Sequence, residues 1–135
     1  MNRKQSVILV LDDLADWRAT LRGLLEDWGY TVHTAGSTEQ ALRLLENTPV
    51  DLALLDIRLD ETDEGNTEGL SLASVIKERW PDIKVVVITG YDTPDVLQKA
   101  MQPDLQGHSL VADYLPKVDT NDKLIQVIEK VLAKP

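Results

Sequence analysis

Carboxylate, hydroxyl and amine side chains stand where apolar runs of the sequence end. Asp12 and Asp13 follow the run VILVL, and Asp56 follows LALL. Thr89 closes the run VVVI, and Lys117 follows a weaker one. Crowded carboxylates repel one another unless a cation is present, and hard oxygen ligands favour Mg²⁺. Such a set could accept a phosphoryl group, with Asp56 as the nucleophile and with the metal and Lys117 neutralising the phosphoryl oxygens.

The elements that must bring these residues together show two alternating hydrophobic patterns. Short apolar runs rich in β-branched residues predict strands at residues 6–11, 30–35, 52–55 and 84–89, with a weaker one at 111–115. Apolar residues at steps of three and four predict helices at residues 14–28, 37–45, 70–80 and 124–132. Thr93 and Pro94 indicate the start of a further helix, and Ser37 and Gln40 have the spacing of a capping box.

The alternation of strands with helices predicts a doubly wound α/β fold, in which one five-stranded parallel sheet carries helices on both faces. The strand at residues 30–35 has the polar alternation of an edge strand. Ligands of such sheets bind outside the carboxyl ends of the strands. We therefore expect the five residues above at one rim of a single domain that spans residues 1–135.

The composition disfavours several kinds of partner. The chain has 14 Lys and Arg against 23 Asp and Glu, a net charge of −9, which repels nucleic-acid backbones and anionic membrane surfaces. It has no cysteine, so disulfides and thiolate metal sites are excluded. No apolar run approaches the ~20 residues of a membrane span, and no signal-peptide pattern opens the chain. We expect a cytoplasmic protein that binds neither nucleic acid nor membrane.

The motifs LVLDD, LALLDIRL, VVVITGY and DYLPK follow one another in this order. Through them the chain resembles a receiver domain of the two-component response regulators, over essentially its whole length. The resemblance implies a flavodoxin-like sheet with strand order 2-1-3-4-5 and no output domain within this chain. It also implies a signalling phosphoacceptor rather than an enzyme, which receives its phosphoryl group from a sensor histidine kinase or a phosphotransfer protein. The sequence identifies neither the output partner nor the oligomeric state, for which a homodimer is one option.

The resemblance assigns roles to individual residues. Asp56 corresponds to the phosphoacceptor, and Lys117 corresponds to the active-site lysine. Thr89 corresponds to the switch threonine and takes part in the chemistry, and Tyr114 corresponds to the switch aromatic residue. Phosphorylation of Asp56 would then switch the interaction surface of the domain.

The resemblance also implies a metal site and a slow loss of the phosphoryl group. Mg²⁺ would be held by Asp13, Asp56 and the backbone carbonyl of Arg58, with Asp12 assisting through water. Arg58 and Tyr91 correspond to the positions that flank the path by which water attacks the acyl phosphate. Both side chains are bulky, and neither is a carboxylate or amide that could orient a water as a general base. We therefore expect the phosphorylated form to hydrolyse slowly.

The chain departs from the family pattern in three places. Lys117 is followed by Val118 where the family has a proline with a cis peptide, and because a non-proline cis bond costs about 3–4 kcal/mol, we expect a trans bond. Asp60 replaces a proline after the phosphoacceptor, and the acidic loop of residues 60–68 is longer than the usual one. A second insertion, around residues 102–109, precedes the last strand. The mode of output therefore cannot be transferred from the family.

Other functions fit the same residues less well. A flavin-binding electron carrier has this fold class, but Asp12 and Asp13 would repel its phosphate. A phosphatase of the haloacid dehalogenase type needs a second aspartate two residues after the nucleophile, where this chain has Arg58. One alternative stays open, a receiver-like interaction module that is rarely or never phosphorylated. Asp13 also has a purely structural interpretation, as the N-cap of the helix that follows it.

Overall fold

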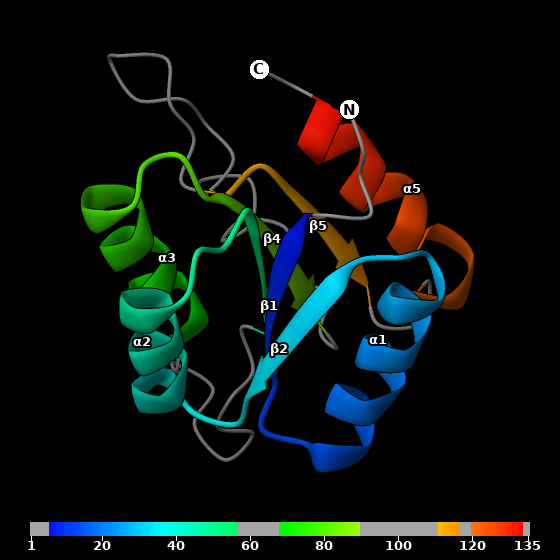
Figure 1. The fold of residues 1–135 in the computed structure, drawn as a ribbon, viewed down its shortest axis with the longest axis horizontal. Coiled ribbons are helices and arrows are strands. Elements are labelled where there is room, and N and C mark those ends of the chain that lie inside the picture. Colours follow the sequence, from blue (N-terminus) through cyan, green and yellow to red (C-terminus); the bar gives the residue numbers. More distant parts are fainter. Residues whose placement is uncertain (1–5, 57–67, 90–110, 117–119, 134–135) are drawn as a thin grey trace.

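The computed structural model describes residues 6–56, 68–89, 111–116 and 120–133, whose strands form one parallel sheet (Figure 1). The strands are β1 (Val7–Leu11), β2 (Thr31–Ala35), β3 (Leu52–Asp56), β4 (Lys84–Thr89) and β5 (Asp113–Pro116). They pair in the order β2-β1-β3-β4-β5. The helices within the described residues are α1 (Ala15–Asp27), α2 (Thr38–Asn47), α3 (Glu68–Arg79) and α5 (Thr120–Ala133). The predicted doubly wound α/β fold and its strand order are confirmed.

Helices cover both faces of the sheet, with α2 and α3 on one face and α1 and α5 on the other (Figure 1). Alternate residues of β3 point to the two faces. Ala53 and Leu55 pack in the cluster formed with α2 and α3, while Leu52 and Leu54 pack in the cluster formed with α1 and α5. Burial on both faces explains the continuous apolar run, because each large aliphatic side chain contributes about 1.5–3 kcal/mol when it is fully buried.

The strand prediction is least accurate at the edge formed by β5. This strand begins at Asp113, two residues later than the expected start, and ends at Pro116. Val111 is fully buried in the cluster on the α2 and α3 side, and the N–H of Ala112 donates to the carbonyl of Val85 at 2.7 Å. The apolar character of residues 111–112 therefore reflects packing ahead of the strand. At the opposite edge, β2 confirms the expected edge strand.

Helix α1 ends where the sequence predicts. Gly29 has a φ of 93°, a left-handed conformation that favours glycine, and its N–H donates to the carbonyl of Glu26 at 2.9 Å. Trp28 continues the apolar spacing of the helix, yet it is the C-cap residue and is 58% exposed. The core face of α1 is formed instead by Leu21 and Leu25, which are both buried.

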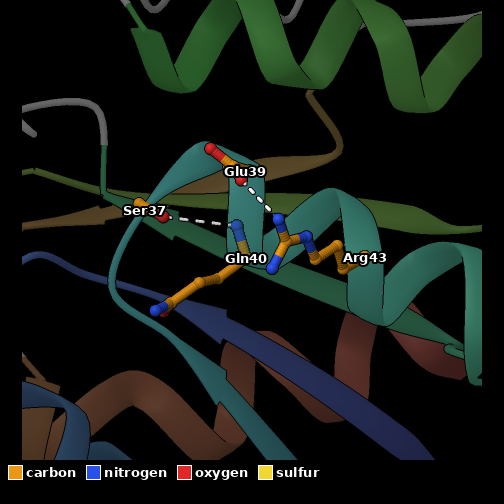
Figure 2. Close-up of polar contacts among 4 residues, drawn as sticks. All are labelled: Ser37, Glu39, Gln40 and Arg43. Atoms are coloured by element: carbon orange, nitrogen blue, oxygen red, sulfur yellow. Dashed lines mark hydrogen bonds and ion pairs between the residues drawn. The ribbon is translucent and has the colours of Figure 1, made fainter.

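Helix α2 begins with the predicted cap, shown in Figure 2. The Oγ of Ser37 accepts a hydrogen bond from the backbone N–H of Gln40 at 3.2 Å. The Oε1 of Gln40 accepts from the N–H of Gly36 at 2.8 Å, one residue before the N–H that a full capping box uses. An exposed ion pair joins Arg43 to Glu39 at 2.6 Å and contributes about 0.3–0.5 kcal/mol. Side-chain contacts of α2 therefore fix the turn that follows β2.

Helix α3 begins at Glu68, two residues before the expected start at Leu70. The further helix expected from Thr93 and Pro94 lies outside the described residues, as do the insertion around residues 102–109 and all but the end of the acidic loop. None of the helices in the described segments has the length and apolar character needed to cross a bilayer.

Candidate functional site at the carboxyl edge of the sheet

The register of the sheet brings Asp12 and Asp56 to the same edge. Leu11, the last residue of β1, pairs with Leu55 of β3. Asp12 directly follows Leu11 and Asp56 directly follows Leu55, so both aspartates lie where the two neighbouring strands end. Asp13 is next in the chain and adds a third carboxylate at this edge. The predicted convergence of the three aspartates is therefore present in the fold.

One carboxylate oxygen from each of Asp12, Asp13 and Asp56 lies within 4.8 Å of the others. Asp12 is 1% exposed and Asp56 is 2% exposed, whereas Asp13 is exposed. At such a separation each pair of like charges repels by roughly 1–3 kcal/mol, for effective dielectric constants of about 20–80. A divalent cation would relieve this repulsion, and a donor set made only of oxygen fits Mg²⁺.

Hydrogen bonds fix Asp12 through its main chain and its side chain. Its N–H donates to the carbonyl of Ala35 at 3.1 Å, its Oδ1 accepts from the N–H of Leu14 at 2.9 Å, and its carbonyl accepts from Nη1 of Arg18 at 2.7 Å. The N-cap residue of α1 is Leu14, which makes no side-chain cap bond. The interpretation of Asp13 as the helix N-cap is therefore wrong, and Asp13 belongs to the carboxylate cluster instead.

The strands β4 and β5 place two further residues of the predicted site. Ile88 pairs with Asp56, so the backbone of Thr89, the last residue of β4, lies beside the carboxyl end of β3. Tyr114 of β5 pairs with Val87, which lies two residues before the end of β4, and Tyr114 is 40% exposed. The sheet thus places the backbone of Thr89 beside the end of β3, whereas Tyr114 lies one strand further out and is exposed to solvent in part.

Three residues of the predicted site, Lys117, Arg58 and Tyr91, lie outside the described residues. The peptide bond between Lys117 and Val118 lies outside them as well, and no cis bond occurs in the described segments. The roles expected of these residues therefore rest on the sequence resemblance.

Arg18 is the residue near the site that sequence reasoning missed. It is half-buried, donates to the carbonyl of Asp12, and lies so close to Gly36 that a Cβ added there would be 2.8 Å from its Nη1. The apolar spacing that predicts α1 gives no weight to a charged residue between Trp17 and Leu21. The available signal is a single arginine in the first turns of a helix that follows two aspartates.

Comparison with known families decides the identity of this fold. Residues 8–129 match the response regulator receiver domain. This stretch contains all three clustered aspartates and the five strands of the sheet, apart from the first residue of β1. The chain belongs to the response regulator receiver domain family. The resemblance inferred from the four motifs is confirmed, and this receiver domain is part of a signalling family.

Curated relatives of this receiver domain include transcriptional regulators. The alginate biosynthesis transcriptional regulatory protein AlgB of Pseudomonas aeruginosa is 36% identical over 123 residues, which are 91% of this chain and 25% of AlgB. The transcriptional regulatory protein ZraR of Escherichia coli is 34% identical over 126 residues, which are 93% of this chain and 26% of ZraR. The receiver domain thus spans about a quarter of the length of the curated relatives it matches.

Solved structures with this fold include other response regulators. The crystal structure of NtrX from Brucella abortus in complex with ADP superimposes with a TM-score of 0.77 at 31% identity, over 94% of this chain and 26% of that one. The response regulator protein TrrA from Thermotoga maritima, in complex with Mg²⁺-BeF, has a TM-score of 0.76 at 27% identity and covers 94% of this chain and 99% of TrrA. The strand order and layers described above are those of receiver domains.

Proposed function

We propose that this receiver domain accepts a phosphoryl group on Asp56, with Mg²⁺ bound at the carboxylate cluster, and that phosphorylation switches its interaction surface. One observation carries the proposal. A carboxylate that is 2% exposed ends the central strand β3, within 4.8 Å of carboxylate oxygens of Asp12 and Asp13. Three aspartates in this arrangement do not stabilise the fold through mutual attraction, so a role with a cation and a phosphoryl group accounts for their being together.

The carboxylate of Asp56 is suited to act as the nucleophile. Its backbone is held between β1 and β4 in the middle of the sheet, which restricts the directions from which a donor can approach. Asp12 and Asp13 would hold Mg²⁺ together with Asp56 and the backbone carbonyl of Arg58. When bound, the metal supplies positive charge that offsets the charge of the carboxylates and the phosphoryl oxygens. The Mg²⁺-BeF complex of TrrA supports the choice of metal.

The remaining roles follow the family resemblance. Lys117 would pair with a phosphoryl oxygen, and the hydroxyl of Thr89 would donate to another. The position of Thr89 beside the end of β3 supports its part in the switch. Tyr114 would carry the change outward along β5, and its 40% exposure leaves room for its side chain to move. Arg58 and Tyr91 would limit access of water to the acyl phosphate.

Partners and location complete the proposal. The phosphoryl donor would be a sensor histidine kinase or a phosphotransfer protein in the cytoplasm, and the chain would act as a phosphoacceptor rather than an enzyme. Its net charge of −9 argues against direct binding of nucleic acid by this domain. AlgB and ZraR are transcriptional regulators, so the output would come from a separate segment or protein that reads the switched surface. Separately from its output partner, the receiver domain could form a homodimer.

The test is phosphorylation by a small acyl-phosphate donor, followed by intact mass measurement. We expect the protein to gain one phosphoryl group, to require Mg²⁺ for this, and to lose the gain when Asp56 is replaced in Asp56→Asn. Absence of labelling with the small donor and with phosphorylated kinases would contradict the proposal. That result would support the alternative of an interaction module that is not phosphorylated.

A further inference from the structure

Arg18 contacts the main chain of Asp12, one of the three aspartates of the carboxylate cluster. Among the described residues its one side-chain hydrogen bond runs from Nη1 to the carbonyl oxygen of Asp12, at 2.7 Å. The bond is part-buried, and a charged donor makes it stronger than a neutral hydrogen bond. The guanidinium therefore restrains the backbone of the acidic pair and does not take the place of a cation bound between the carboxylates.

The turn after β2 is built to admit this guanidinium. A Cβ added to Gly36 would lie 2.8 Å from Nη1 and 3.2 Å from Cζ of Arg18, so no larger residue fits unless Arg18 moves. The N–H of Gly36 donates to Oε1 of Gln40 at 2.8 Å, and this bond holds the turn in place. The half-buried guanidinium thus lies between the end of β1 and this turn.

We propose that Arg18 is a positioning residue for the Mg²⁺ site. Its guanidinium holds the carbonyl of Asp12 and thereby sets the distance from the carboxylates of Asp12 and Asp13 to that of Asp56. The inference rests on the proposed function, because it takes the carboxylate cluster to be the place where Mg²⁺ binds. Gly36 in turn leaves space for the guanidinium of Arg18. Arg18 and Gly36 therefore both influence the Mg²⁺ affinity of the site, although neither is a metal ligand.

Positioning and simple electrostatics predict opposite results when Arg18 is removed. If the guanidinium acted only as a nearby positive charge, its removal would strengthen the binding of Mg²⁺. If it holds the acidic pair in place, its removal weakens binding, and loss of a residue that orients a metal ligand typically weakens binding about 10- to 100-fold. The sign of the change in Mg²⁺ affinity therefore separates the two roles.

The experiment measures Mg²⁺ binding by calorimetry, and phosphorylation by a small acyl-phosphate donor as a function of Mg²⁺ concentration, in wild type and Arg18→Met. We expect the Mg²⁺ dissociation constant and the half-saturating Mg²⁺ concentration to rise about tenfold in the variant. The labelling rate at saturating Mg²⁺ stays close to that of wild type. A purely structural role would lower the thermal midpoint and leave the half-saturating concentration of the folded protein unchanged.

A second variant moves Arg18 without deleting it. Gly36→Ala adds one methyl group 2.8 Å from Nη1 of Arg18, which is too close unless the guanidinium shifts. The φ of Gly36 is not in the left-handed region, so alanine adds no backbone strain. We expect weaker Mg²⁺ binding in Gly36→Ala and no further weakening when it is combined with Arg18→Met. Gly23→Ala is the matched control, since a Cβ at that helical position meets nothing within 4 Å.

The outcomes separate this inference from the proposed function. Unchanged or tighter Mg²⁺ binding in Arg18→Met overturns the positioning role. The role is also overturned if Gly36→Ala weakens Mg²⁺ binding by the same factor in wild type and in Arg18→Met. If Arg18→Met fails to fold, Gly36→Ala alone decides, and wild-type affinity in that variant overturns the role. Failure of the wild-type protein to bind Mg²⁺ would instead contradict the proposed function on which the inference rests.

Discussion

The two ends of strand β3 each carry an aspartate, and the two residues are used in opposite ways. Asp51 precedes the strand, is exposed, and accepts a hydrogen bond from the N–H of Val7 through Oδ2 at 2.7 Å. Its N–H and carbonyl bond to Val7 and Lys84, at 2.8 and 3.1 Å, so the residue joins the starts of three strands. Asp56 ends the strand, is 2% exposed, and lies in a cluster of carboxylates.

The difference shows how a parallel sheet separates stability from chemistry. At the amino edge the carboxylate of Asp51 accepts a hydrogen bond from the backbone N–H of Val7, which stabilises the fold. At the carboxyl edge the neighbouring strands deliver several carboxylates to one place, and their repulsion destabilises the fold. Carboxylates that repel one another at the place where they meet are candidates for function.

Removal of Asp13 is the change with the largest expected effect on this comparison. Asp13→Ala deletes one of the three carboxylates that we propose hold Mg²⁺. We therefore expect Mg²⁺ affinity to fall by more than about 100-fold, beyond the range seen when residues behind a ligand are changed. The protein should remain folded without Mg²⁺, since the change removes a like charge. Calorimetric titration measures the affinity, and Asp16→Ala, an exposed acidic residue in the first turn of α1, is the control. A wild-type Mg²⁺ affinity in Asp13→Ala would show that the carboxylates at the carboxyl edge of the sheet do not form a metal site, which would contradict the proposed difference between the two edges.

The lifetime of the phosphorylated form is the next test. If Arg58 and Tyr91 limit the access of water, the double variant Arg58→Asn, Tyr91→Glu should lose its phosphoryl group about tenfold faster, because it gains groups that can orient a water as general base. Decay of the purified phosphoprotein is followed by intact mass. Asp51→Asn, changed at the amino edge, should decay at the wild-type rate. Equal or slower decay of the double variant would remove the shielding argument.

Stability without Mg²⁺ should change with opposite sign at the two ends of β3. Asp51→Ala removes the acceptor for the N–H of Val7, so we expect the free energy of unfolding to fall by about 1 kcal/mol. Asp56→Asn removes one charge from the cluster, so we expect the free energy of unfolding to rise by about 1 kcal/mol. Urea denaturation in a chelating buffer measures both. A loss of stability in Asp56→Asn would mean that Asp56 is a structural residue like Asp51.

The smallest effect is expected at Ser37, which lies on the carboxyl side of the sheet but has a structural role. Ser37→Ala removes the acceptor for the N–H of Gln40 shown in Figure 2, and should lower the free energy of unfolding by about 0.5–1 kcal/mol. Mg²⁺ affinity should stay at the wild-type value. Urea denaturation measures the change in stability, and calorimetry on the same samples measures Mg²⁺ affinity. A change in Mg²⁺ affinity would show that residues outside the carboxylate cluster, such as Ser37, also affect the metal site.

The sequence predicts the fold well because the central strands are unambiguous. The runs around Leu54 and Val86 are buried on both faces, and such runs, alternating with helical patterns, favour a parallel sheet between layers of helices. The apolar pattern predicts the start of β5 at residue 111, two residues before the observed start at Asp113. Val111 and Ala112 are apolar because they pack in or against the hydrophobic core ahead of the strand. Boundaries fail where tertiary packing, rather than the pattern of one element, decides what is buried.

The site was predictable in part for a different reason. Strand ends are visible in the sequence, so the convergence of Asp12, Asp13 and Asp56 follows from the fold class. The contact of Arg18 with the carbonyl of Asp12 was not predictable, because it joins a helix side chain to a main-chain atom, and a single arginine after two aspartates does not specify that bond. The space at Gly36 has the same character, since only the structure shows what a larger side chain would meet.

The most direct test of the central claim is the extent of phosphorylation in two matched variants, Asp56→Asn and Asp51→Asn, measured side by side by intact mass after incubation with Mg²⁺ and a small acyl-phosphate donor. Both changes replace a carboxylate by an amide of the same shape, at opposite ends of one strand. The account predicts one phosphoryl group in wild type and in Asp51→Asn, and none in Asp56→Asn. Labelling of Asp56→Asn at the wild-type rate, or loss of labelling in a folded Asp51→Asn, would contradict it.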